Sequence, residues 1–411
     1  MSDILIKPSR LTGKVKVPLS KSAAHRAVIC SALAGGGEVI PPGESISDDI
    51  AATEKAVSEI IDAKRSQKSI ITVDCGESGS TLRFLIPLAA ALGVSAVFTG
   101  RGRLPSRPIG VYLDCLPKHS VTCESSGGLP LKISGRLTPG VFTLPGDISS
   151  QFITGLLLSL PLLEGQSKIC LLSPLESSGY VDMTVQTMDD FGVHVEKTKS
   201  GWLIPGNQKY KKKSGYKVEE DWSQAAFFIA AGALGGNIEI EGLNFSSKQG
   251  DRAAETLFRK LGADIQEKHG ILFACPGSLR GIKIDASQIP DLVPVLAATA
   301  ALCKGETLIY NAKRLRLKES DRLSAMANGL NSLGGNVRET PDGLVINGID
   351  KLKAGKADGC GDHRIVMALS IAALKARGNV IITGSESISK SYPDFFKDYR
   401  SLGGKAYDMG R

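Results

Sequence analysis

The sequence predicts an α/β fold of two domains, and three observations lead to that prediction. Short β-branched runs alternate with helical patterns along the chain. A glycine followed by a strand pattern recurs about every 70 residues, which indicates an internal repeat. One class of helix is apolar on almost every side, so these helices must be buried. Six such units suggest two domains of three units each, with buried helices inside and sheets and amphipathic helices outside.

The repeat is clearest in the second half of the chain. Gly235, Gly305 and Gly378 each open a run typical of a half-buried strand. Each run leads to an amphipathic helix; the one from Ser320 should end at Gly334, a favoured C-cap residue. In the first half, Gly165 opens a copy of the same design, Gly93 opens a weaker copy, and a degenerate first unit begins at Gly36.

The chain is expected to leave one domain and re-enter it. This gives a discontinuous C-terminal domain of residues 1–19 and 221–411 around an N-terminal domain of residues 20–220. Residues 1–19 should supply a strand to the C-terminal domain.

The buried helices have polar starts, where Ser or Asp is first of all a favoured N-cap. If these helices pack in bundles of three, their positive ends face one surface of each domain, which predicts an anion site in a cleft between the domains. The starts lie at Ser20, Ser78, Ser149, Asp221, Pro290 and Asp362.

Composition narrows the function classes. With 42% hydrophobic and 22% charged residues the chain is neither disordered nor collagen-like. A net charge of +8 fits acidic small substrates or nucleic acid.

No stretch is long enough to span a membrane, and no signal or transit segment is evident, so a cytosolic protein is predicted. The eight cysteines form no CxxC pair, which favours reduced thiols over a zinc site. The basic run Lys209–Lys213 is interpreted as a solvated hairpin tip.

Cations are concentrated at the helix starts, where they oppose the helix dipole. This pattern predicts an anion held between them. Arg107 is expected to open an outer helix, with Pro108 in its first turn. The cations are Lys21, Arg26, Arg83, Arg107, Lys318, Arg322, Arg364 and Lys390.

Two carboxylates lie among these cations and have no place in a site that only binds anions. Glu319 lies between Lys318 and Arg322, and Asp291 begins an apolar helix. A carboxylate beside cations and an apolar wall can act as a general acid or base. Alternatively, Asp291 is an N-cap and Glu319 an ion-pair partner. His25 is interpreted as structural.

Six motifs, taken in order, resemble those of the 5-enolpyruvylshikimate-3-phosphate synthases. They begin at Ser20 (SKSAAHR), Arg107 (RPIG), Ser149 (SSQ), Leu317 (LKESDR), Asp362 (DHR) and Lys390 (KSYPD). The resemblance runs from about Lys7 to Gly404. It implies six βαβαββ units in a two-domain, inside-out α/β barrel-like fold.

The resemblance also implies the reaction. The enolpyruvyl group of phosphoenolpyruvate passes to the 5-hydroxyl of shikimate-3-phosphate with release of phosphate, late in aromatic amino-acid synthesis. No metal or organic cofactor is implied, and the partners are these two small molecules rather than nucleic acid or a membrane. Both substrates are polyanions, so convergent cations must offset their repulsion. A monomer is expected, with domains that close on the substrates.

The residue roles follow from the same resemblance. Asp291 is the proton acceptor for the 5-hydroxyl, and Glu319 donates a proton to the methylene carbon, with Lys21 as the alternative donor. Shikimate-3-phosphate is held by Lys21, Ser22, Arg26, Ser149, Ser150, Gln151, Ser177, Tyr180, Asp291 and Lys318. Phosphoenolpyruvate is held by Lys21, Gly79, Arg107, Gln151, Arg322, His363, Arg364 and Lys390.

Some positions depart from the family pattern. Glu77 places a negative charge beside an anion site, Arg314 replaces an Asn that contacts the acceptor, and a Lys after Ser177 is missing. Glycine at position 79 predicts competitive inhibition by glyphosate.

Two other functions are considered. One is enolpyruvyl transfer to UDP-N-acetylglucosamine, in which a loop cysteine acts; Cys115 and Cys123 lie near that region. The other is a non-catalytic RNA-binding protein, against which the low aromatic content of 5% argues.

Overall fold

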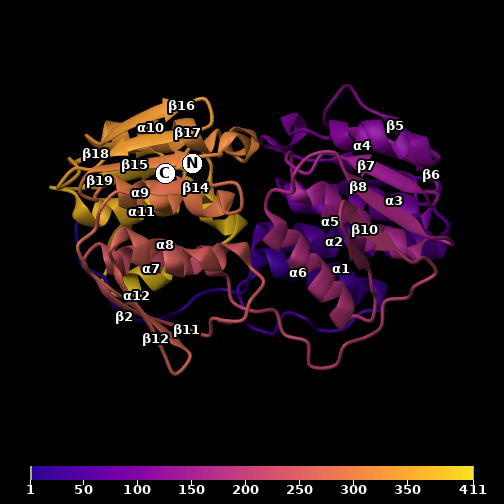
Figure 1. The fold of residues 1–411 in the computed structure, drawn as a ribbon, viewed down its shortest axis with the longest axis horizontal. Helices are drawn as coiled ribbons and strands as arrows, with labels where there is room; N and C mark the ends of the chain where they lie inside the picture. Colours follow the sequence, from indigo (N-terminus) through magenta and orange to yellow (C-terminus); the bar gives the residue numbers. More distant parts are fainter. Residues whose placement is uncertain (1, 411) are drawn as a thin grey trace. The chain divides into compact units, whose positions relative to one another are not determined.

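The computed structural model describes residues 2–410, which divide into two compact units. The C-terminal unit combines Met1–Ser20 with Glu219–Arg411, and the N-terminal unit is Lys21–Val218 (Figure 1). These boundaries lie one or two residues from the expected crossings. At the crossing, Leu19 and Glu220 form an antiparallel bridge, so the two connecting segments run side by side.

The C-terminal unit contains three four-stranded sheets, in the orders β18-β19-β1-β20, β12-β13-β11-β2 and β14-β15-β17-β16. Their strands are β1 (Asp3–Lys7), β2 (Thr12–Lys16), β11 (Asn237–Glu241), β12 (Asp264–Lys268), β13 (Ile271–Cys275), β14 (Lys283–Asp285), β15 (Glu306–Tyr310), β16 (Asn336–Thr340), β17 (Gly343–Asn347), β18 (Gly355–Asp358), β19 (Val380–Thr383) and β20 (Lys405–Asp408). Residues 1–19 supply strand to this unit as expected, but two strands rather than a single one. β1 pairs antiparallel with β19 and β20, whereas β2 pairs parallel with β11 in another sheet.

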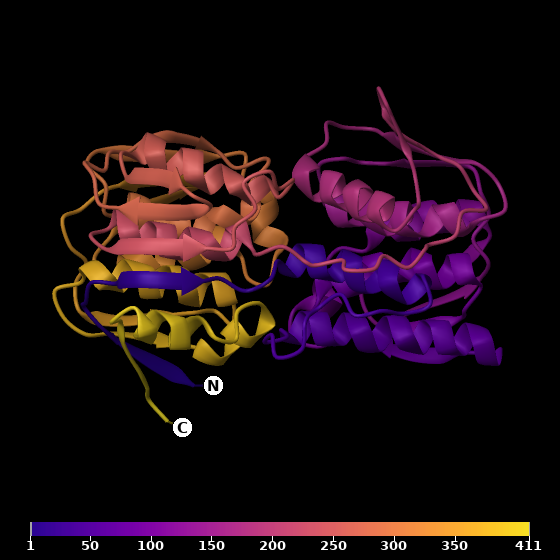
Figure 2. The same ribbon diagram turned by 90° about the horizontal axis from the view of Figure 1, so that it is seen from below.

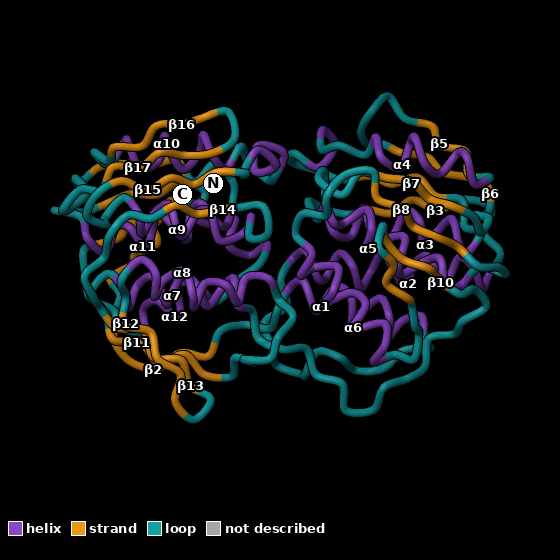
Figure 3. The backbone as a smooth tube through the Cα atoms, viewed as in Figure 1, coloured by secondary structure: helices purple, strands orange, loops and turns teal. Residues whose placement is uncertain are grey.

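Three helices form the interior of this unit: α7 (Trp222–Ala233), α9 (Val293–Ala300) and α11 (His363–Ala372). Every residue of the three is buried, as their apolar sequences predict. They pack on one another, and the sheets β14-β15-β17-β16 and β12-β13-β11-β2 lie on opposite sides of them (Figure 3). The more polar α8 (Ala253–Leu261), α10 (Arg322–Ser332) and α12 (Phe395–Ser401) lie outside them. Gly334, at φ +82°, follows α10 as expected.

The N-terminal unit has two four-stranded sheets, ordered β3-β4-β6-β5 and β7-β8-β10-β9. Their strands are β3 (Ile71–Asp74), β4 (Ala96–Thr99), β5 (Val121–Glu124), β6 (Leu131–Gly135), β7 (Val141–Leu144), β8 (Ser167–Leu171), β9 (Glu196–Thr198) and β10 (Gly201–Ile204). The helices are α1 (Lys21–Leu33), α2 (Asp48–Ser66), α3 (Gly79–Leu92), α4 (Gly110–Cys115), α5 (Ser150–Ser159) and α6 (Ser178–Asp190). Figure 2 draws this unit in indigo to magenta.

The first repeat differs from the other five, because it has no sheet among the described residues. Residues 34–47 form a loop between α1 and α2. The loop contains Gly35, Gly36, Gly37, Pro41, Pro42 and Gly43. Proline cannot donate to a strand ladder and glycine weakens one, so this segment is poorly suited to a sheet.

Two local predictions were wrong. Residues 205–219 form an irregular connection rather than a hairpin, although Lys209 and Lys211–Lys213 are exposed as expected. Tyr210 anchors this connection, because its buried hydroxyl donates to the carbonyl of Leu158. Arg107 opens no helix: it ends a 3₁₀ turn at Leu104–Ser106, and Pro108 precedes α4.

No helix among residues 2–410 is long and apolar enough to cross a membrane. All eight cysteines are free thiols, and four of them are buried: Cys30, Cys75, Cys115 and Cys303. Residues 2–410 contain no group of three metal-ligating side chains placed to hold an ion.

Candidate active site

The first candidate site lies in the C-terminal unit, where the N-terminal ends of α7, α9, α10 and α11 meet. We call its charged residues the arginine–carboxylate cluster: Asp291, Lys318, Glu319, Arg322, Asp362 and Arg364. Asp362 and Asp321 are N-caps, since they accept hydrogen bonds from the backbone N–H groups of Arg364 and Ser324. These caps fix where α11 and α10 begin and so place the arginines.

Arg322 is the centre of the cluster and is 1% exposed. Its Nε donates to Asp362 Oδ2 at 2.9 Å, its Nη1 to Asp291 Oδ1 at 2.9 Å and its Nη2 to Glu319 Oε2 at 2.8 Å. Each of these partners comes from a different segment. One guanidinium therefore holds three carboxylates in fixed directions.

Arg364 binds the other side of Asp291. Its Nη2 lies 3.0 Å from Asp291 Oδ2 and 3.0 Å from the hydroxyl of Ser223, while Nη1 donates to the Asp291 carbonyl at 3.1 Å. Lys318 Nζ is 3.7 Å from Asp291 Oδ1. Asp291 thus faces three cations. It does not cap α9, so the N-cap interpretation was wrong.

The electrostatics follow from this arrangement. Burial alone would raise the pKa of Asp291, but Arg364, Lys318 and Arg322 outweigh it and hold the pKa well below its usual range. Burial would likewise raise the pKa of Asp362, yet Arg322 keeps that pKa low. The pKa of Arg322 is raised, because its three carboxylates outweigh burial. Both aspartates and Arg322 are therefore charged at neutral pH.

His363 and Lys390 lie next to this cluster. His363 is 1% exposed, and its Nδ1 is 3.9 Å from Asp362 Oδ1. Lys390 Nζ donates to the Gly361 carbonyl at 2.9 Å. The loop before α11 therefore links both residues to the arginine–carboxylate cluster.

The second candidate site lies in the N-terminal unit, at the starts of α1, α2, α3 and α5. Lys21 Nζ donates to Asp49 Oδ2 at 2.8 Å, which joins the first turns of α1 and α2. One turn further along α1, His25 Nδ1 lies 2.7 Å from Thr53 Oγ1, which lies 2.6 Å from Thr81 Oγ1. Burial, then Lys21 and Arg26, lowers the pKa of His25 well below its usual value, so this buried imidazole is neutral.

Gly79 and Arg107 form a close contact in this unit. A Cβ at position 79 would lie 2.6 Å from Arg107 Nη1 and 2.8 Å from its Cζ. Arg107 is 6% exposed. The missing side chain of Gly79 therefore leaves the space that the guanidinium occupies.

The start of α5 provides hydroxyl and amide groups. Ser149 caps the helix, and the Gln151 amide connects Ser80 Oγ at 2.9 Å with Arg83 Nη1 at 2.7 Å. Ser150 and Ser177 are buried. Ser177 is held at φ +56° just before α6.

Arg26 connects α1 with α6. Its Nε donates to Thr184 Oγ1 at 2.8 Å and its Nη2 to the Tyr180 carbonyl at 2.8 Å, while Nη1 donates to the Ser22 carbonyl. Burial lowers its pKa to about 10, so it stays charged at neutral pH. Tyr180 thus contacts Arg26 through its backbone.

The structure brings the predicted residues together within each unit. The expectation that both groups border one cleft stays a prediction. Sequence reasoning missed Asp49 and Ser223 as partners of Lys21 and Arg364. It assigned no role in the site to Asp362, and it named Arg83 among the cations without giving it a substrate contact. Asp362 could have been found, because it starts a motif that also contains Arg364.

Comparisons with known proteins agree with one another. Residues 5–399 match the family model described as EPSP synthase (3-phosphoshikimate 1-carboxyvinyltransferase). Proteins named 3-phosphoshikimate 1-carboxyvinyltransferase from Clostridium acetobutylicum and Clostridium novyi are 47% and 44% identical, over 99% and 100% of both chains. An EPSP synthase structure from Acinetobacter baumannii has a TM-score of 0.79 at 24% identity and covers 100% of both chains. The enolpyruvyl transferase NikO from Streptomyces tendae has a TM-score of 0.74 at 18% identity over 99% of both. These two structures support the two-domain α/β fold.

Proposed function

The chain belongs to the EPSP synthase family, and from that premise we infer that it is a 3-phosphoshikimate 1-carboxyvinyltransferase. It transfers the enolpyruvyl group of phosphoenolpyruvate to the 5-hydroxyl of shikimate-3-phosphate and releases phosphate. This is a step of the shikimate pathway to the aromatic amino acids. The residue roles below are proposals.

One observation supports these roles most strongly: Arg322 and Arg364 share the carboxylate of Asp291. In the free protein Asp291 and Glu319 serve as counter-ions for cations that we assign to phosphoenolpyruvate. The carboxylate and phosphate of that substrate suit the forked geometry of arginine. Bound substrate would take over some of these N–H donors and leave the two carboxylates less stabilised as anions.

This exchange prepares both carboxylates for proton transfer. Asp291 is a weak base while three cations hold its pKa low. Sharing those cations with a polyanion raises its proton affinity, so it accepts the 5-hydroxyl proton as the oxygen attacks C2 of phosphoenolpyruvate. Glu319 gives a proton to the methylene carbon, with Lys21 as the alternative donor. The tetrahedral adduct then loses a methyl proton and phosphate, which restores the double bond.

The N-terminal unit is assigned to shikimate-3-phosphate. Ser149, Ser150 and Ser177 hold its phosphate, and Gln151 and Tyr180 lie near its ring. Lys21 contacts both substrates, while Ser22 and Arg26 hold the side of shikimate-3-phosphate that carries its carboxylate. Arg26 already uses three of its nitrogens within the protein, which supports a role in positioning Ser22.

The remaining phosphoenolpyruvate ligands are Gly79, Arg107, His363 and Lys390, and Lys318 contacts the acceptor. We propose that the units close when the two polyanions bind. We also propose that the protein is a monomer in the cytoplasm and that glyphosate inhibits it competitively.

The reaction is tested by phosphate release from phosphoenolpyruvate with each acceptor in turn. Shikimate-3-phosphate should support turnover and UDP-N-acetylglucosamine should not; the reverse result would assign the sister activity. Asp291→Ala and Glu319→Gln should each lower kcat about 100-fold or more while shikimate-3-phosphate still binds. Near-normal turnover in either variant would remove that residue from the mechanism.

A further inference from the structure

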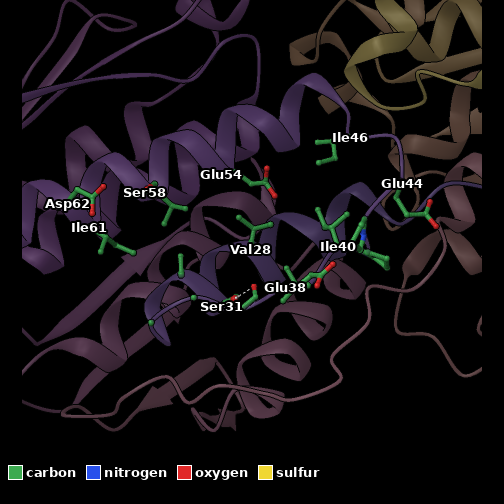
Figure 4. A pocket seen from close by; sticks show the side chains of 18 of the residues that line it. Val28, Ser31, Glu38, Ile40, Glu44, Ile46, Glu54, Ser58, Ile61 and Asp62 are labelled. Atoms are coloured by element: carbon green, nitrogen blue, oxygen red, sulfur yellow. Dashed lines mark hydrogen bonds between the residues drawn. The ribbon is translucent and has the colours of Figure 1, made fainter.

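A cavity of about 510 Å³ lies in the N-terminal unit, between α1, α2 and the loop of residues 34–47. We call it the loop cavity. It lies where the first repeat has a loop in place of a sheet. Figure 4 shows Val28 of α1, Glu54 of α2, and Glu38 and Ile40 of the loop around the same space. Its volume is that of a site for a small molecule.

Apolar and polar groups contribute similar shares of the wall of the loop cavity. Val28 and Val57 are buried side chains on the facing helices, and Ile40 and Ile61 add to the lining. Ile46, also in the lining, is 45% exposed. An apolar surface of this kind favours a ligand with an apolar body.

The polar part of the lining is strongly acidic, in contrast to the net charge of +8 on the whole chain. Four carboxylates and one guanidinium line the cavity, and the guanidinium of Arg65 lies 3.7 Å from Asp62. Within residues 2–410, Glu38 and Glu54 have no cationic partner. Burial raises the pKa of Glu54, because no neighbouring charge offsets the loss of water.

These features select the class of ligand. An anion would meet the negative charges of half-buried Glu54 and of Glu38, which is exposed to water. A metal ion is disfavoured, because the described residues contain no group of three ligating side chains placed to hold one. A cation with an apolar body satisfies both the carboxylates and the apolar wall.

We propose that the loop cavity is a binding site for a small organic cation, such as a primary ammonium group on an aromatic or aliphatic body. The cation lies between Glu38 and Glu54, and the body contacts Val28 and Val57. The proposal does not depend on enolpyruvyl transfer, because none of these residues belongs to the candidate active site.

The test uses 2-phenylethylammonium as the probe and 3-phenylpropionate, an anion with the same ring, as the control ligand. Saturable binding of the probe is expected by equilibrium dialysis, with a Kd of about 0.1 to 1 mM for its nine non-hydrogen atoms. Binding should be about five- to tenfold weaker in Glu54→Gln and in Glu38→Gln. Glu59→Gln is the matched control, because Glu59 lies on the same helix beside Lys55 and outside the cavity lining.

Three results would overturn the proposal: no saturable binding of the probe, equal binding of the anion, or equal affinity of Glu54→Gln and Glu59→Gln. Phosphate release confirms that each variant is folded. If Glu54→Gln is unstable, Ser58→Trp at the exposed rim fills the entrance instead. Loss of binding in that variant supports the site, and retained binding refutes it.

Discussion

Both candidate sites hold cations near buried helix ends, but they balance the positive charge in different ways. In the C-terminal unit, one buried guanidinium contacts three carboxylates, so positive charge is balanced inside the protein. In the N-terminal unit, hydroxyls, amides and a neutral imidazole form many of the contacts, together with the ion pair between Lys21 and Asp49. The first site should therefore respond strongly to charge removal and little to mild acid. The second should respond to substitutions that fill space, such as one at Gly79, and to the protonation of His25.

The chain offers a way to observe the units separately, because each contains one of the two tryptophans. Trp202 lies in β10 of the N-terminal unit, and Trp222 starts α7 of the C-terminal unit. In a Trp202→Phe background, fluorescence reports the C-terminal unit, and in Trp222→Phe it reports the N-terminal unit. The stability predictions below use these backgrounds.

The largest effect is expected from Asp362→Asn. Asparagine keeps the N-cap of α11, but Arg322 loses a carboxylate at 2.9 Å in a fully buried position. The free energy of unfolding of the C-terminal unit should fall by about 3 to 5 kcal/mol in urea titrations. Asp408→Asn is the control, because its ion pair with Arg400 is exposed and should contribute less than about 1 kcal/mol. Similar losses in both variants would contradict the role of buried charge.

The next effect concerns space in the N-terminal site. Gly79→Ala places a methyl group where Arg107 lies, so the guanidinium must shift. We expect KM for phosphoenolpyruvate to rise about tenfold, with resistance to glyphosate and a smaller change in kcat. Gly110→Ala is the matched control, since a Cβ there meets no atom within 4 Å. Unchanged KM and unchanged inhibition in Gly79→Ala would remove Arg107 and Gly79 from the substrate site.

A smaller effect is expected from pH. His25 has a folded pKa well below its unfolded value of about 6.5, so the unfolded state binds the extra proton. Its contribution to stability is fully present above about pH 6.5 and is lost as pH falls toward the folded pKa. Asp291 and Asp362 also have depressed pKa values, but their contribution is lost only below about pH 4. Between pH 7.5 and 5.5 the N-terminal unit should therefore lose about 1 kcal/mol and the C-terminal unit little. His25→Asn should reduce this difference without abolishing it, because burial also lowers the pKa of His119 in the same unit. An equal pH response of both units would contradict the prediction.

An effect of similar size on stability, with little effect on turnover, should come from Thr53→Val. The substitution preserves shape but removes the hydroxyl between His25 and Thr81. The N-terminal unit should lose about 1 kcal/mol, and phosphate release should change little. A loss above about 3 kcal/mol would indicate that the network is cooperative rather than pairwise.

Much of this architecture could be predicted from the sequence, because the signals are local. The apolar helices, their Ser and Asp caps and the repeat each depend on residues close together in the chain. The candidate site residues could be named from motifs for the same reason. The pairing of Lys21 with Asp49 and of Arg364 with Asp291 could not, because these partners are far apart in sequence and meet only through helix packing. The sequence showed that the first repeat is degenerate, but not that it lacks a sheet, although the glycines and prolines of residues 34–47 suggest this.

One pairing also bears on how the protein is made. Asp3 of β1 pairs with Thr383 of β19, so the first strand finds its neighbour only when almost the whole chain has left the ribosome. At about 5 to 20 residues per second, that wait lasts about 20 to 75 seconds. Lys21–Val218 can fold during this time, while β1 exposes an apolar edge to aggregation or to a chaperone.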